Sequence, residues 1–283
     1  MAHIIVPEAE AILDKEFKVL DKGFVRLIDY LGGDGRIVQA ARVSYGQGTK
    51  TIREDKGLID YLLSHQHTSP FEQVILTFHC KMPIFIARQW VRHRTARINE
   101  ISGRYSVMAD EFYVPAPDQV KYQSISNRQG RAEEDVPAEL RQKVLDVLTR
   151  EQKSAYENYG NLIDDGIARE LARINLPLSL YTQWYWQIDL SNLFHFLKLR
   201  LDYHAQWEIR QYGKVIAEIT KKVAPLAYQA FETHVLNAVT FSGKEIQALV
   251  LQLQGKAHEL KGINKTEFEA KIQRILSTDK TVL

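Results

Sequence analysis

This chain lacks the features of disulfide-stabilised, membrane-spanning and secreted proteins. Its single cysteine, Cys80, excludes an intrachain disulfide and a cysteine-based metal cluster. No uninterrupted apolar run approaches the roughly 18 residues that a transmembrane helix needs. The segment Met1–Glu8 has neither the basic start nor the long apolar stretch of a secretory signal. We therefore expect a cytoplasmic protein that is not associated with a membrane.

The chain also lacks a large excess of either positive or negative charge, since its formal net charge is only +2 at pH 7. This balance argues against a protein that coats nucleic acid, so any affinity for anions must come from local clustering. Hydrophobic residues make up 45% and charged residues 25% of the 283 residues, which is typical of a globular protein with a substantial core.

The apolar periodicity predicts one α+β domain with a helical C-terminal appendage. The expected strands span residues 19–31, interrupted by a turn at Asp21-Lys22-Gly23, and residues 73–82 and 180–188. The expected helices span residues 36–42, 56–65, 137–160, 168–177, 192–223 with a bend after residue 201, 244–260 and 266–276. Another helix is expected to begin at Pro83, while Ser191 caps the helix at 192 and Pro225 ends it. Residues 118–135 are polar and turn-rich, which predicts a surface insertion.

Residues 92–105 concentrate four arginines, a histidine, a carboxylate, an amide and hydroxyls directly after an apolar segment. Fixed cations beside apolar residues suit a phosphate-bearing ligand with a flat apolar part, such as a nucleotide or a flavin. A solvated basic helix end would have the same charge count, so the charge count alone leaves both interpretations open.

The order of residues in this stretch favours a ligand site. If the helix that begins at Pro83 continues through Arg92, then Arg88 and Arg92 lie on one helical face. Ser102-Gly103 predicts a turn that offers backbone N–H groups and a hydroxyl to a phosphate. Glu100 either orients an arginine, accepts from a ribose hydroxyl, or forms a surface ion pair.

Several ordered blocks resemble the flavin-dependent thymidylate synthases. The signature is Arg92-His93-Arg94, then seven residues, then Ser102. A single short motif is weak evidence, but several blocks in order are specific. The other matching blocks are Ala40–Ser44, His65–Glu72, Phe85–Trp90, Asn99–Tyr105, Ala172–Pro177 and Leu199–Ile209.

The resemblance implies an enzyme that methylates dUMP to dTMP, with methylenetetrahydrofolate as one-carbon donor and FAD, reduced by NADPH, as hydride source. It implies an α+β fold with a mixed or antiparallel sheet flanked by helices, and homotetramers whose active sites are shared between subunits. We expect an N-terminal arm at residues 1–18, a catalytic domain at 19–230 and a helical extension at 231–283.

The resemblance also assigns site residues. Arg200 is the expected catalytic residue, because a guanidinium beside uracil N3 and O2 would favour the ionised base. The expected dUMP-binding residues are Gln89, Trp90, Val91, Arg92, Glu100, Ile101, Ser102, Gly103, Arg104, Arg173 and Arg200. The expected FAD-binding residues are His67, Ser69, Arg92, His93, Arg94, Glu100, Asp189, Leu190, Ser191 and His195. His204 matches a family position near the flavin, although a histidine that faces the core fits the sequence nearly as well.

Two chemistries are disfavoured. Cys80 lies in a strand-like apolar run outside the matching blocks, so we interpret it as a packing residue and not as a thiolate nucleophile. His65 and His67 have no third ligand nearby in the sequence, so no metal site is expected.

Some positions depart from the family pattern, namely Ser69, Arg97, Asp189-Leu190-Ser191 and His195. Binding of FAD is therefore expected to keep its location and differ in detail. Two alternatives remain open at this point. One is a nucleotide- or nucleic-acid-binding protein without catalysis, and the other is a flavoprotein oxidoreductase that acts on another pyrimidine nucleotide.

Overall fold

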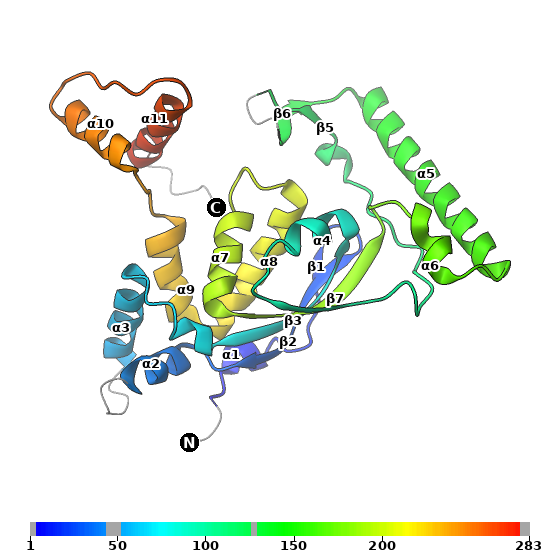
Figure 1. The fold of residues 1–283 in the computed structure, drawn as a ribbon, viewed down its shortest axis with the longest axis horizontal. Helices are drawn as coiled ribbons and strands as arrows, with labels where there is room; N and C mark the ends of the chain where they lie inside the picture. The colour runs from blue at the N-terminus through cyan, green and yellow to red at the C-terminus, as the bar shows by residue number, and fades with distance from the viewer. Residues whose placement is uncertain (1–3, 44–51, 126–128, 278–283) are drawn as a thin grey trace. The chain divides into compact units, whose positions relative to one another are not determined.

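Five antiparallel strands form the central sheet of the main unit in the computed structural model, which describes residues 4–43, 52–125 and 129–277. Their order is β1-β2-β3-β7-β4, and Figure 1 labels β1, β2, β3 and β7. The strands are β1 (Phe17–Val19), β2 (Gly23–Leu31), β3 (Ile75–Pro83), β7 (Tyr181–Asp189) and β4 (Arg97–Glu100). Burial alternates along β3, where Leu76, Phe78, Cys80 and Met82 are fully buried and the residues between them are half-buried. This period of two identifies one face of the sheet as the core face.

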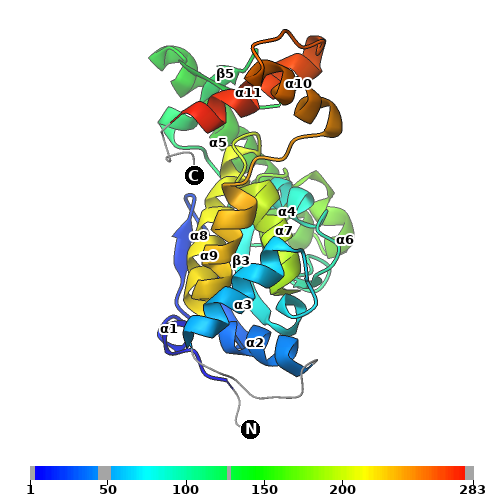
Figure 2. The ribbon, with the colours of Figure 1, turned by 90° about the vertical axis from the view of Figure 1, so that its left-hand side faces the viewer.

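Three helices cover the core face: α4 (Ile84–Trp90), α7 (Leu190–Arg200) and α8 (Trp207–Val223) (Figures 1 and 2). An aromatic cluster joins them to the sheet. The ring of Trp90 lies 5.5 Å from Trp184, 5.1 Å from Trp186, 5.1 Å from Phe196 and 5.8 Å from Tyr212. Large rings packed at these separations anchor α4 and α7 firmly, so side chains at the ends of these helices have fixed origins.

A second group of helices packs beside the sheet: α1 (Pro7–Glu10), α2 (Asp34–Arg42), α3 (Ile52–Ser64) and α9 (Pro225–Phe231), with a short 3-10 turn, η2 (Phe71–Gln73). Asp34 in α2 accepts hydrogen bonds from the N–H groups of Leu226 (2.8 Å) and Ala227 (2.9 Å) at the start of α9. Burial raises the pKa of Asp34 to about 6.

The segment between β4 and β7 holds a hairpin and the longest helix. The elements are η3 (Pro117–Gln119), β5 (Lys121–Gln123), β6 (Arg131–Asp135), α5 (Ala138–Asp164), α6 (Arg169–Ala172) and η4 (Arg173–Asn175). The polar stretch 118–135 therefore contains a two-stranded sheet.

Residues Glu232–Leu283 form a separate compact unit. It contains a π-helical turn (Glu232–Leu236), α10 (Gly243–Leu253) and α11 (Gly262–Leu276). Ser242 and Glu245 form a capping box at the start of α10, and Lys271 of α11 pairs with Glu245 at 2.6 Å. Among the described residues, no helix in either unit combines the length and apolarity needed to cross a bilayer.

The predicted α+β class and the antiparallel sheet are confirmed, and several element boundaries are corrected. The helix after Pro83 ends at Trp90, so Arg92 lies outside it. Asp189 caps α7, where Ser191 was expected to do so. The helix expected at 192–223 is two helices separated by residues 201–206, and Pro225 opens α9. The expected arm ends inside β1, and strand β4 was not predicted. Residues 1–3, 44–51, 126–128 and 278–283 of the expected segments lie outside the described residues.

Candidate active site

The guanidinium of Arg200 is held in place at the C-terminal end of α7. Its Nε donates to Nε2 of His93 at 3.0 Å, and its Nη2 donates to the backbone oxygen of Gln89 at 2.9 Å. The other N–H groups of the guanidinium have no hydrogen-bond partner in the described part of the chain. Arg200 is thus oriented on one side and free to donate to a ligand on the other.

His93 is buried, and its surroundings keep its imidazole neutral. Burial, followed by the charges of Arg200 and His195, lowers the pKa of His93 to about 4. A neutral ring that accepts at Nε2 carries its proton on Nδ1. The ring packs edge-on against Phe196 with centroids 4.8 Å apart. His93 therefore orients the catalytic candidate, in addition to the flavin contact expected from the sequence.

Exposed cations border this anchored arginine. Arg92 and Arg94 follow the end of α4 and are both exposed. Burial, and then the charge of Arg92, lower the pKa of Arg200, so the two guanidinium groups are close enough to repel. Arg88, in the last turn of α4, is also exposed. A concentration of positive charge of this kind attracts an anionic ligand.

The expected turn at Ser102-Gly103 is present. The N–H groups of Tyr105 and Ser106 both donate to the carbonyl of Ser102 at 3.0 Å. The Ser102 hydroxyl accepts from the N–H of Arg104 at 3.2 Å. The turn therefore has a fixed geometry, as a backbone cradle for phosphate requires.

Arg173, from η4, lies against this turn. A Cβ added to Gly103 would come within 3.1 Å of Cδ and 3.3 Å of Nη1 of Arg173. Glycine therefore permits the close approach of this guanidinium to the turn. Arg104 forms an exposed ion pair with Glu170 of α6 at 3.0 Å, which leaves it free to exchange that partner for a ligand.

The edge strand β4 sets the position of the turn. The Thr182 hydroxyl of β7 donates to Oε1 of Glu100 at 2.5 Å, and the Ile101 N–H donates to the Gln183 carbonyl at 3.0 Å. These contacts fix the chain immediately before Ser102. Among the described residues, Glu100 neither orients an arginine nor forms a surface ion pair, because its partner is the Thr182 hydroxyl; its expected role toward a ribose hydroxyl stays a prediction.

His67 and Ser69 lie in the exposed segment between α3 and η2, before β3. Ser69 lines a hollow of about 410 Å³ together with Arg36 and Gln73. The Nε of Arg36 is buried and has no hydrogen-bond partner in the described structure. An unpaired guanidinium N–H beside a hollow suits an anionic or hydroxyl-bearing ligand.

The start of α7 lies beside this segment, because the Leu190 N–H donates to the Val74 carbonyl at 2.8 Å. The carboxylate of Asp189 accepts from the backbone and side-chain nitrogens of Asn192 at 2.9 and 2.6 Å. Ser191 is half-buried and His195 is exposed one turn further on. The structure therefore brings the expected flavin residues Asp189, Leu190, Ser191 and His195 together in the first turns of α7, next to η2, whereas His67 and Ser69 lie in the segment that leads into η2.

Two expected site residues have buried side chains. Trp90 and Leu190 are both 0% exposed and belong to the core. Within this unit, Trp90 anchors α4 and does not present its ring to a ligand, and Leu190 can contact one only through its backbone. Val91, at the C-cap of α4, is half-buried.

His204 does not face the core. It is exposed, and its backbone and ring nitrogens both lie 2.9 Å from Oδ1 of Asp202. The alternative interpretation of His204 as a core histidine is therefore wrong.

Cys80 is fully buried in β3, and burial raises its pKa well above the ordinary value of a thiol. A thiol that is both inaccessible and neutral cannot attack a substrate carbon.

Sequence reasoning missed a set of polar residues behind Gln89: Tyr113, Arg131, Gln206 and Glu208. Gln89 Nε2 donates to Oε1 of Gln206, and Gln206 Nε2 donates to Oε2 of Glu208 at 2.9 Å. The only signal was that Gln206 and Glu208 fall inside the block Leu199–Ile209.

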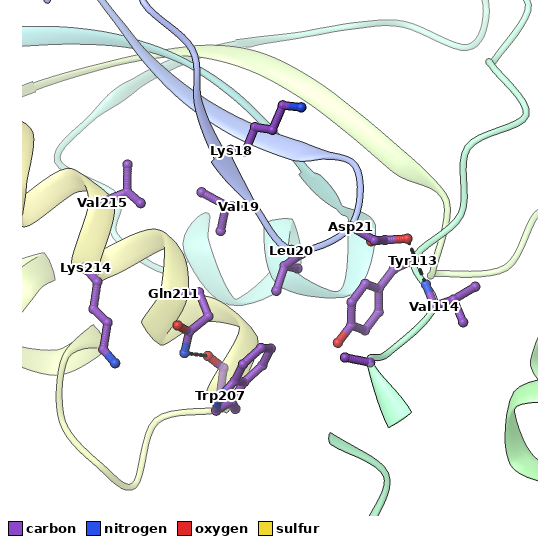
Figure 3. Close-up of a pocket in the computed structure, with 11 residues that line it drawn as sticks. Lys18, Val19, Leu20, Asp21, Tyr113, Val114, Trp207, Gln211, Lys214 and Val215 are labelled. Carbon is purple, nitrogen blue, oxygen red and sulfur yellow. Dashed lines mark hydrogen bonds between the residues drawn. The ribbon is translucent and has the colours of Figure 1, made fainter. Parts of the chain in front are cut away.

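A separate pocket of about 470 Å³ lies between the β1–β2 turn and the start of α8. Figure 3 shows the ring of Tyr113 and the indole of Trp207 on its wall, with Lys214 at its edge. No predicted site residue lines it.

The contacts of the expected site residues fall into three groups. One surrounds Arg200, one surrounds Gly103 and Arg173, and one surrounds the start of α7. Among the described residues, no hydrogen bond or ion pair joins the first group to the second.

Comparison with known proteins gives consistent matches. Residues 26–226 match the family model described as thymidylate synthase complementing protein, and residues 239–276 match that of the thymidylate synthase ThyX C-terminal domain. The chain is 60% identical over 261 residues to a flavin-dependent thymidylate synthase from Treponema denticola, covering 92% of this chain and 98% of the relative. It is 49% identical to the corresponding protein of Rickettsia bellii, covering 94% and 96%. A solved structure of a UMP/dUMP methylase PolB from Streptomyces cacaoi, bound with 5-Br dUMP, superposes with a TM-score of 0.70 at 32% identity over 78% of this chain and 99% of that chain.

Proposed function

We propose that this chain, which belongs to the flavin-dependent thymidylate synthase family, converts dUMP to dTMP. The observation that carries the proposal is the guanidinium of Arg200, which is oriented by His93 and Gln89 beside exposed arginines. The co-substrates are methylenetetrahydrofolate and NADPH, and the cofactor is FAD.

Two of the three groups of residues bind dUMP. Gln89, Arg92 and Arg200 take the base, while the Glu100–Arg104 turn takes the phosphate and the sugar. The N–H groups of a fixed turn and adjoining guanidinium groups together match a phosphate. Arg173, which was expected at the uracil base, lies against this turn, so in this proposal it approaches the nucleotide from the side of the sugar and the phosphate.

Arg200 carries the chemistry that this chain itself supplies. Its free N–H groups donate to N3 and O2 of uracil and stabilise negative charge there, which makes C5 more nucleophilic. His93 cannot add a competing positive charge, because its pKa of about 4 keeps it neutral near pH 7. C5 then takes up the one-carbon unit that the folate provides in exchange for its own proton, and no enzyme thiolate takes part because Cys80 is buried.

The residues present fit a flavin dinucleotide. Exposed Arg92 and Arg94 suit its diphosphate, and the exposed rings of His67 and His195 can contact a flat ring system. The hollow beside Ser69, with the unpaired Nε of Arg36, offers polar partners for a ribose or a phosphate. When bound, the reduced flavin supplies the hydride that completes the methyl group.

Complete sites require a homotetramer in this proposal. Support comes from the family to which the chain belongs, since the resemblance implies active sites shared between subunits. We further propose that the catalytic domain spans residues 19–230 after a short arm, that residues 231–283 form a helical extension, and that the enzyme works in the cytoplasm.

The decisive experiment incubates the FAD-loaded protein with dUMP labelled with tritium at C5, methylenetetrahydrofolate and NADPH. The expected result is release of tritium to water and formation of dTMP, both dependent on the folate. UMP in place of dUMP tests substrate choice, since the similar solved structures are described as UMP/dUMP methylases. Flavin reduction without tritium release would support an oxidoreductase, and the absence of flavin binding would contradict the proposal.

A further inference from the structure

We infer that Glu208 is a positioning residue that fixes the orientation of the Gln89 side-chain amide in the nucleotide site, acting through Gln206. This inference rests on the proposed function and deepens it. Gln206 hydrogen-bonds to both Glu208 and Gln89, so the three side chains form the hydrogen-bond chain Glu208–Gln206–Gln89. Neither residue was expected in the site.

The chain begins at a buried carboxylate. Glu208 lies in the first turn of α8 and is only 1% exposed. Its Oε1 accepts from Arg131 of β6 and from the Tyr113 hydroxyl at 3.1 Å. Its Oε2 accepts from Nε2 of Gln206 at 2.9 Å. The buried charge is thus paired and hydrogen-bonded on both oxygens, so it has one stable arrangement.

The carboxylate sets the direction of every bond that follows. A glutamate paired with arginine only accepts hydrogen bonds, so Gln206 must turn its NH₂ group toward Glu208. The Gln206 carbonyl then faces Gln89, which must present its own NH₂ group in return. A side-chain amide that could otherwise flip is held in one of its two orientations.

The fixed orientation of Gln89 determines which of its atoms faces a bound nucleotide. With its NH₂ group directed at Gln206, Gln89 turns its carbonyl Oε1 the other way. This oxygen has no hydrogen-bond partner among the described residues. It is therefore available to accept from an N–H or hydroxyl group of bound dUMP. The same residue holds Arg200 through its backbone oxygen at 2.9 Å, so the Glu208–Gln206–Gln89 chain sets an acceptor directly beside the catalytic donor.

The chain also connects the site to the hairpin at 121–135. Arg131 reaches Glu208 from β6 and lies 5.9 Å above the Trp207 ring. Tyr113 and Trp207 both line the pocket of Figure 3, so this pocket adjoins the Glu208 end of the hydrogen-bond chain. The Gln89 orientation thus depends on residues outside the arginine motif.

The test is an exchange of the carboxylate and the amide. Glu208→Gln removes the acceptor-only group, so Gln206 and Gln89 can flip. We expect the KM and the Kd for dUMP to rise by about fivefold to tenfold, with a smaller change in kcat and normal flavin content. Gln206→Glu alone places two carboxylates in contact and should raise the KM for dUMP further than Glu208→Gln does. The double variant Glu208→Gln with Gln206→Glu restores an acceptor that faces Gln89, and we expect its KM for dUMP to return to within about twofold of wild type.

Glu245→Gln is the matched control, because it makes the same change at a buried, paired glutamate in the C-terminal unit. Its KM should not change. Gln206→Met replaces Glu208→Gln if that variant does not fold, and should raise the KM in the same way. A wild-type KM in the folded single variants, or no recovery in the double variant, would overturn the inference. A wild-type protein that does not turn over dUMP would instead overturn the proposed function.

Discussion

Individual side chains in this site are defined by their partners more than by their own type. The sequence shows that arginines are abundant in the expected site, but it does not show how they differ. In the structure, two hydrogen bonds orient Arg200, whereas Arg92 and Arg94 are exposed. Donors that are already oriented lose less conformational freedom when a ligand binds, so they stabilise a charge that develops in the transition state more strongly.

Arg200→Ala should therefore lower kcat by about 10²- to 10³-fold while FAD remains bound. Turnover and the visible spectrum of the bound flavin are measured on the same sample. Arg150→Ala, which removes an exposed arginine of α5, is the control. Kinetics close to wild type in the Arg200 variant would remove this residue from the catalytic role.

Cys80→Ala should retain turnover, because its thiol is buried and protonated. Loss of packing around the missing sulfur should cost about 1 kcal/mol of unfolding free energy, which urea denaturation measures. An inactive variant with an unchanged flavin spectrum and a normal denaturation midpoint would point to a thiolate mechanism after all.

His93 should make stability depend on pH. Its folded pKa of about 4 lies below the ordinary 6.5, so between these values the unfolded chain binds more protons. The free energy of unfolding should therefore fall as the pH drops from 6.5 toward 4, by on the order of 1–3 kcal/mol from this group. Asp34, whose pKa is raised to about 6, has the opposite slope.

His93→Gln isolates the effect, since glutamine can accept from Arg200 but does not titrate. The difference in unfolding free energy between variant and wild type should change with pH only in that window. A constant difference would show that His93 titrates normally.

At the level of elements, apolar periodicity predicted most helices and strands, and polar segments account for most of the errors. All four residues of β4 are exposed, so no alternation marks this strand, and its identity depends on pairing with β7. The end of α4 at Trp90 was missed because the arginines that follow are good helix formers. The β5–β6 hairpin rests on backbone pairing within a polar stretch, which sequence patterns do not report.

The cap of α7 gives an element-scale prediction. Asp189→Ala removes the acceptor for the Asn192 N–H and should cost about 1 kcal/mol, or roughly 2–4 °C in Tm. Asp189→Ser keeps a capping oxygen and should retain most of the stability. Equal Tm values for both variants and wild type would show that the cap contributes nothing.

At the level of the whole molecule, family resemblance named the expected site residues, but it could not predict which of them the fold of one chain brings together. Periodicity and motifs describe one chain, whereas a shared site depends on surfaces of neighbouring chains. The residues outside the motif, such as Arg131 at Glu208, were also invisible because long-range contacts leave no local pattern.

The proposed sharing of active sites between subunits predicts complementation between inactive variants. Arg200→Ala and Arg173→Ala should each be inactive alone, while coexpressed subunits should recover up to about a quarter of wild-type activity through mixed assemblies with intact sites. Coexpression of Arg200→Ala with Arg92→Ala, in the same group, should recover none. Absence of recovery in the first pair, with mixed assemblies demonstrated, would place both groups in one subunit.

Helix α7 carries expected flavin residues at its first turns and Arg200 at its last residue, over eleven residues. At about 1.5 Å per residue, the helix sets a separation of roughly 16 Å between its two ends. Inserting one residue would rotate Arg200 by about 100° away from its partners. The length of this helix is therefore under stricter constraint than the identity of its exposed side chains.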